Sequence, residues 1–165
     1  EALRDADHGS TAADYIRWAK EVDGVGQAWV INSIPPFVDI RIVSNDEEDL
    51  EAGAPLIASV QAYMDDDDRK PVNAVPLVAS ATVTAQPFTF GALSPNNAAT
   101  QAAITAALTT LLKAIRVPGR TLYRNEAIAA VVNTGVVTSF TLTVPSGDVS
   151  YGMVEIPTLG VITFP

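Results

Sequence analysis

The chain contains no cysteine and only one histidine, His8, among its 165 residues. Disulfide bonds and thiolate metal sites therefore cannot hold the fold together, which must rest on buried apolar side chains. Apolar residues make up 48% of the sequence, enough for a core in one domain or in two small ones. No run of apolar residues approaches the roughly 18 that a membrane span needs, so we expect no membrane partner.

Charge is distributed unevenly along the chain. Residues 1–70 carry six basic and sixteen acidic side chains, a net of −10, whereas residues 71–165 carry four and three, a net of +1. We interpret this contrast as two domains with different surfaces; the alternative is an acidic half that docks on a basic neighbour in an assembly. The overall net charge of −9 argues against a nucleic-acid partner, because phosphate binding needs a basic face.

Helix and strand periodicities alternate in the first half. Thr11 and Asp14 have the spacing of a helical capping box, and Gly24 is placed to end the helix that follows. Val38, Ile40 and Ile42 alternate with polar residues, which is typical of a sheet with one solvated side. The first half is thus predicted to contain a helix at 12–22, strands at 25–31 and 37–43, and a helix that begins at Pro55.

The second half opens with a strand-forming stretch at 72–85, followed by a predicted loop from Pro87 to Ser94. Ser94 and Pro95 then have the pattern of an N-cap and a first-turn proline. The remaining predicted elements are a helix at 96–115 with Ile104, Leu108, Leu111 and Ile115 on its core face, a fourth helix capped by Asn125, and strands at 136–144 and 161–164.

These patterns predict an α+β fold of two small modules, at residues 1–70 and 71–165. Each module should contain a few-stranded, mainly antiparallel sheet with helices packed on one face. A helix followed by Gly-Val and a strand occurs at Gly24-Val25 and again at Gly135-Val136. This echo is either coincidence, since glycine commonly ends helices, or the trace of two related modules.

Residues with catalytic or metal-binding potential lack the settings that such chemistry needs. His8 has no G-x-S-x-G element to supply a nucleophile for a catalytic triad. The run Asp65 to Asp68 lacks the spaced carboxylates, central glycine and final glutamate of an EF-hand, so we interpret it as a solvated acidic turn. We therefore expect no catalytic residue, no metal, no cofactor and no enzymatic activity.

Five residues are candidates for protein contacts. Arg116, Arg120 and Arg124 flank Pro118-Gly119 and form the only basic cluster in the acid-poor half. Cations at the end of a helix also favour its dipole, so local structural use is the competing interpretation. Trp18 and Tyr151 are large amphipathic side chains that serve either in a core or at an interface.

Several segments carry a family resemblance through their order along the chain. They are Gly9-Ser10-Thr11-Ala12-Ala13-Asp14-Tyr15, Trp18-Ala19, Gly24-Val25, Ala28-Trp29-Val30, Val60-Gln61-Ala62-Tyr63-Met64, Arg69-Lys70-Pro71-Val72 and Ile156-Pro157-Thr158-Leu159-Gly160-Val161-Ile162. This ordered series resembles the phage baseplate J-like family of contractile-tail wedge proteins, including those of Mu-like prophages. The match would correspond to the C-terminal portion of a full-length member. Lys70 departs from it, since arginine is expected before Pro71.

The resemblance implies a virion structural protein located in the tail baseplate, and in the host cytoplasm during assembly. It implies partners among other baseplate and tail proteins and multiple copies in one assembly, with no catalytic residues to carry over. An alternative from another class is a pair of ACT-like, ligand-sensing regulatory modules, because small α+β modules in tandem also serve that purpose.

Overall fold

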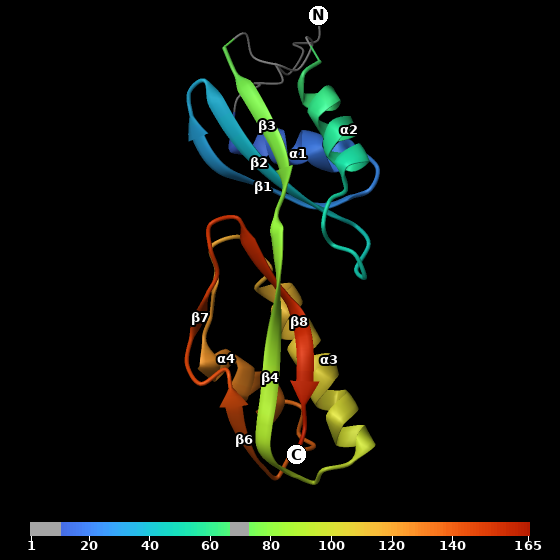
Figure 1. Ribbon diagram of the computed structural model, residues 1–165, viewed down its shortest axis with the longest axis vertical. Helices are drawn as coiled ribbons and strands as arrows, with labels where there is room; N and C mark the ends of the chain where they lie inside the picture. Colours follow the sequence, from blue (N-terminus) through green and yellow to red (C-terminus); the bar gives the residue numbers. More distant parts are fainter. Residues whose placement is uncertain (1–10, 67–72) are drawn as a thin grey trace, which may run out of the picture. The chain divides into compact units, whose positions relative to one another are not determined.

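The computed structural model describes residues 11–66 and 73–165, and the chain divides into two compact units, Glu1–Ala81 and Thr82–Pro165. Each unit has its own strands and helices (Figure 1). Each unit also has its own apolar core. The predicted α+β class with two modules is confirmed. His8, Asp67, Asp68 and the segment 69–72 lie outside the described residues.

The first unit contains two helices and a three-stranded sheet. Its elements are α1 (Ala12–Glu21), β1 (Val25–Ile34), β2 (Phe37–Ser44), α2 (Ala54–Met64) and β3 (Val75–Ser80). The strand order is β1-β2-β3, with β1 antiparallel and β3 parallel to the central strand. The sheet is thus mixed, because α2 provides the crossover that a parallel pair requires.

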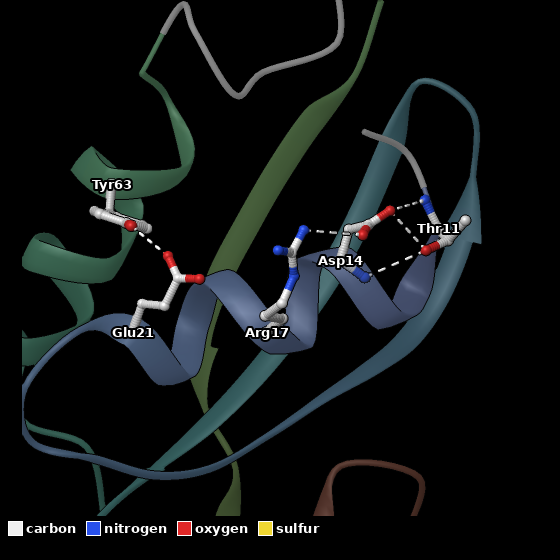
Figure 2. A network of polar contacts seen from close by, with 5 residues as sticks. All are labelled: Thr11, Asp14, Arg17, Glu21 and Tyr63. Atoms are coloured by element: carbon white, nitrogen blue, oxygen red, sulfur yellow. Dashed lines mark hydrogen bonds and ion pairs between the residues drawn. The ribbon is translucent and has the colours of Figure 1, made fainter. Parts of the chain in front are cut away.

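Helix α1 begins at the predicted capping box, which is present in the structure (Figure 2). The Asp14 backbone N–H donates to Thr11 Oγ1 at 3.3 Å, and the Thr11 backbone N–H donates to Asp14 Oδ2 at 3.3 Å. These bonds satisfy donors that a helix start otherwise leaves open, and the Thr11 hydroxyl bond holds the pKa of Asp14 below its usual value. At the other end of α1, the Tyr63 hydroxyl of α2 donates to the Glu21 carboxylate.

The core of the first unit lies between one face of the sheet and both helices. Tyr15 and Trp18 of α1 meet edge to face, with ring centroids 5.4 Å apart. They pack on the alternating residues of β2 that the sequence predicted to face inward. The buried members are Tyr15, Trp18, Ala19, Ala28, Val38, Ile40, Ile42, Ala52, Val60 and Met64.

The second unit is built around one long strand. Its elements are β4 (Thr82–Ser94), α3 (Ala98–Ala114), β5 (Thr121–Leu122), α4 (Arg124–Val132), β6 (Ser139–Val144), β7 (Val149–Ser150) and β8 (Glu155–Thr163). The main sheet has the order β6-β4-β8, with β6 antiparallel and β8 parallel to β4, while β5 and β7 form a separate antiparallel ribbon. In the first unit, a hairpin joins the central strand β2 to its antiparallel neighbour β1. In the second unit, two helices lie between the central strand β4 and its antiparallel neighbour β6. The repeated sequence pattern of a helix, Gly-Val and a strand therefore does not extend to the topology.

The core of the second unit lies between this sheet, α3 and α4. Helix α3 packs along β8 (Figure 1), and Ile104 and Leu108 are fully buried on its inner face. Phe90 of β4 stacks on Phe164 with ring centroids 5.4 Å apart. The buried members are Phe88, Phe90, Ile104, Leu108, Leu112, Ile115, Leu122, Ala127, Val131, Leu142 and Tyr151.

The predicted loop from Pro87 to Ser94 is wrong, because β4 continues through it to Ser94. Proline weakens a central strand, since it donates no hydrogen bond to the ladder. Here Pro87 sits at a register shift between Gln86 and Phe88 in the pairing with β8. Burial of Phe88 and Phe90 against the helices then stabilises the strand beyond the proline.

Other boundaries also move. The N-cap of α3 is Asn97, whose side chain accepts from the Thr100 N–H at 3.0 Å, rather than Ser94. The N-cap of α4 is Tyr123, two residues before the predicted cap at Asn125, and the helix begins at Arg124. Strand β8 begins at Glu155 rather than 161 because its first half pairs with β4. The strand predicted at 72–85 is replaced by two strands in different sheets: β3 pairs with β2, and β4 pairs with β6 and β8.

Candidate interaction surfaces

Arg124 is bound to the backbone of its own unit. Its Nη2 donates to the Leu142 carbonyl at 2.7 Å, and its Nε donates to the Pro145 carbonyl at 3.1 Å. The Arg124 backbone N–H, at the start of α4, donates to Asp148 Oδ1 at 2.8 Å. The guanidinium therefore ties α4 to the end of β6 and the turn that follows, which is a structural use.

Arg120 takes part in a network at the same helix start. Its Nη2 lies 3.0 Å from Glu126 Oε1, and its guanidinium carbon lies 6.0 Å from the centroid of the Tyr123 ring. Glu126 also accepts from the Tyr123 backbone N–H at 3.2 Å, so the carboxylate caps the helix. The Arg120 side chain is 44% exposed, so it is the member of the basic cluster most accessible to a partner.

Arg116 lies at the end of α3 and is only 8% exposed. The three arginines therefore have separate environments: one is buried, one is paired on the surface and one binds carbonyl groups. The structure does not gather them into a common basic surface. The carbonyl contacts of Arg124 fit local structural use, whereas the protein-contact role of the three arginines stays a prediction.

Trp18 and Tyr151 belong to the cores of their units, each with 6% of its surface exposed. The Tyr151 hydroxyl donates to Gln86 Oε1 at 2.9 Å, and Gln86 Nε2 donates to the Pro87 carbonyl at 2.8 Å. Burial raises the pKa of Tyr151 to about 12, because the phenolate would be poorly solvated there. Both residues pack within the cores of their units, and their role in contacts with a partner stays a prediction.

Large apolar side chains are exposed instead at the tip of the β1–β2 hairpin and the start of β3. We call these four residues the hairpin-tip patch: Ile34 (64% exposed), Phe37 (53%), Val75 (37%) and Leu77 (49%). Phe37 pairs with Ile34 on β1 and with Val75 on β3, so the three share one face of the sheet. That face is opposite to the one that α1 and α2 cover, because Val38 and Ile40 point the other way.

A bidentate ion pair lies beside the hairpin-tip patch. Arg41 Nε and Nη2 contact Asp39 Oδ1 and Oδ2 at 2.8 and 3.1 Å, and both residues are on the same face as Phe37. Asp39 also lies opposite Leu77 in the register with β3. An apolar patch bordered by a neutralised pair has the composition of a protein interface, with an apolar centre and a polar rim.

The second unit presents a groove of about 600 Å³ between α3 and α4. Five alanines line it, at positions 106, 107, 114, 129 and 130, together with Thr110, Leu111, Glu126, Asn133 and Thr134. We call it the α3–α4 groove. Its short side chains leave a shallow, open and largely apolar hollow, whereas Ile104 and Leu108 of α3 fill the core.

Sequence reasoning missed both surfaces. The signal for the hairpin-tip patch was present, since Ile34 and Phe37 flank Pro35-Pro36 at a turn, where polar residues are usual. The groove could not be found in the same way. Alanine-rich helices also occur where helices pack tightly against each other. Only the arrangement of α3 and α4 in the structure shows that these alanines line a groove.

Within residues 11–66 and 73–165, no three or more acidic or histidine side chains gather in a position to hold a metal ion. None of the helices in these ranges has the length and apolar character to cross a membrane. The ionisable groups near the surfaces described above are engaged in caps and ion pairs.

Two protein-family models match the chain. Residues 7–85 match the model described as Baseplate J-like central domain, and residues 88–165 match the Baseplate J-like protein C-terminal domain. The interval between the two matches falls close to the division of the chain into compact units. No curated protein matches the chain.

Proposed function

This chain belongs to the baseplate J-like protein family, and we propose that it is a wedge component of a contractile phage or prophage tail. It acts by assembly with other baseplate and tail proteins and not by catalysis. Its place is the baseplate of the virion, after a period in the host cytoplasm during assembly. The matches to two consecutive domains of the family support this proposal most directly.

The surfaces of the two units support a role in assembly. The hairpin-tip patch and the α3–α4 groove are apolar features of modest size, and a neutralised ion pair borders the patch. A wedge must hold its neighbours before contraction and release or rearrange them afterwards, which favours modest contacts over one large apolar interface. Multiple copies of the chain would present both features repeatedly around the tail.

An antibody against this chain tests the proposal on intact particles of the phage or prophage that encodes it. Electron microscopy should place the label at the baseplate end of the tail, outside the central tube. On contraction the label should move away from the tube tip together with the baseplate periphery. Label on the head, the tube or the fibres alone, or its absence from purified particles, would contradict the proposal.

The ligand-sensing alternative makes a different prediction. A pair of ACT-like modules should show a higher unfolding temperature in the presence of an amino acid or a nucleotide, because a ligand that binds only the native state stabilises it. A baseplate component should show no such shift. The family matches favour the baseplate function over this alternative.

A further inference from the structure

We propose that the Gln61 side chain closes the free edge of β3 against the addition of a foreign strand, that is, an extended segment of another polypeptide. The Gln61 carboxamide takes the hydrogen-bonding place that a residue of a further parallel strand would take. This inference concerns the first unit alone and does not depend on the proposed baseplate function.

Strand β3 lies at the edge of the sheet in the first unit. Within the described residues it pairs with β2 alone, in an unbroken parallel register. The Val75 N–H donates to the Pro36 carbonyl at 2.7 Å, so the backbone groups of Val75 face β2. Because these groups alternate sides along a strand, the Pro76 carbonyl and the Val78 N–H point away from β2.

An edge strand of this kind is a template for unwanted pairing, because its outward N–H and C=O groups can bind any extended chain that reaches them. Val75 and Leu77 add apolar side chains that are 37% and 49% exposed. The other edge strand, β1, has two register shifts in its pairing with β2, and such irregularities protect an edge. The regular strand β3 needs a different protection.

Pro76 supplies part of this protection, and Gln61 of α2 supplies the rest. Proline has no N–H, so residue 76 offers a foreign strand only its carbonyl. Gln61 Nε2 donates to that carbonyl at 3.0 Å, and the Val78 N–H donates to Gln61 Oε1 at 2.9 Å. A residue of a parallel strand opposite Leu77 would make the same two bonds. Helix α2 runs beside β3 (Figure 1) and so places Gln61 at this edge.

A third contact fixes the orientation of the Gln61 carboxamide. Its Nε2 also donates to Asp65 Oδ2 at 2.9 Å, at the end of α2. A side-chain amide nitrogen has two N–H donors, and here one serves Asp65 while the other serves Pro76. The amide oxygen is thereby directed to the Val78 N–H. The edge of β3 thus has a permanent hydrogen-bonding partner within its own chain.

Hydrogen exchange of single backbone amides, followed by NMR on the full chain, tests the closing bonds. Gln61→Met keeps the length of the side chain and a high helix propensity but removes both polar atoms. We expect the Val78 amide to exchange roughly tenfold faster in this variant, because it loses its acceptor. The Ala81 amide, which donates to the Ile42 carbonyl at 2.9 Å, should keep its rate. An unchanged rate at Val78 would overturn the proposal.

Peptide binding tests whether the edge accepts a strand once it is open. The probe is a short fluorescein-labelled peptide of alternating threonine and valine with a lysine at each end, a sequence that favours an extended conformation. Fluorescence anisotropy should show several-fold tighter binding to Gln61→Ala than to the unsubstituted chain. The control peptide has prolines at its centre and should bind neither protein, since proline donates no ladder bond.

Gln101→Ala is the matched control variant, because Gln101 lies on a helix of the second unit and its side chain donates to Asn96. It should bind the peptide no better than the unsubstituted chain does. Equal binding by Gln61→Ala and the unsubstituted chain would overturn the proposal. Equal binding of the two peptides would overturn it as well, since it would show contact through side chains alone.

Circular dichroism before mixing checks that each variant is folded. If Gln61→Ala does not fold, the exchange rates of Gln61→Met decide the question. Neither experiment bears on the location of the protein in a virion, which the antibody tests separately.

Discussion

Tyr151 and Gln86 form a buried hydrogen bond of 2.9 Å between the residue after β7 and the central strand β4. Both side chains are almost fully buried, with 6% and 5% exposed. The bond joins the β5–β7 ribbon to the main sheet at the point where Pro87 interrupts the ladder. A polar pair in this position orients two elements that apolar packing alone would leave free to slide.

Tyr151→Phe should destabilise the second unit by about 1–2 kcal/mol. The substitution keeps the ring but removes the donor, which leaves Gln86 Oε1 buried without this partner. Urea unfolding followed by circular dichroism measures the change. Tyr123→Phe is the matched control, because its ring is 48% exposed, and it should leave the free energy of unfolding nearly unchanged.

The free energy of unfolding should also decrease at alkaline pH because Tyr151 loses its proton. Its pKa is raised to about 12 in the folded chain from 10.0, so the folded state favours the protonated phenol. The resulting stabilisation is fully present below pH 10 and is lost as the pH rises through 12. Tyr151→Phe should weaken the dependence of the unfolding midpoint on pH between 10 and 12, and an unchanged slope would contradict this assignment.

Gly160→Ala should cost about 1–3 kcal/mol, because it would force two strands apart. A Cβ at position 160 would lie 2.9 Å from the carbonyl carbon and oxygen of Gln86 and 3.1 Å from the Pro87 nitrogen. These are backbone atoms and cannot rotate away. Gly147→Ala is the control, since a Cβ there meets nothing within 4 Å, and the unfolding temperatures of the two variants should differ clearly.

Arg124→Ala should destabilise the second unit by about 1–3 kcal/mol, since Arg124 binds two backbone carbonyls from a partly buried position. Arg120→Ala should cost less, about 0–1 kcal/mol, because its ion pair is exposed to solvent. Chemical denaturation of both variants compares them directly. Equal losses would show that the basic cluster is not divided between structural and surface uses as the contacts indicate.

Local rules predicted much of the fold. The capping box of Thr11 and Asp14, the alternation of Val38, Ile40 and Ile42, and the i, i+4 spacing of Ile104 and Leu108 act over a few residues. Each was found where the pattern placed it, as was the α+β class. The family resemblance is confirmed by matches to two of the family's domains.

Long-range contacts account for the errors. Residues 87–94 contain a proline and a glycine and have the pattern of a loop, yet they form a strand because β6 and β8 pair with it from both sides. The burial of individual side chains shows the same limit of local patterns. Tyr151 and Arg116 are amphipathic or charged, and nothing in their immediate sequence indicates that distant elements bury them.

The sequence by itself determined the number of modules, their class and the absence of cysteine chemistry, because composition and short periodicities encode these properties directly. Only the tertiary structure decided which strands pair, which aromatic side chains enter the cores and where the α3–α4 groove lies. The physical reason is that burial depends on contacts between residues far apart in the chain, and such contacts leave no mark on the pattern of neighbouring residues.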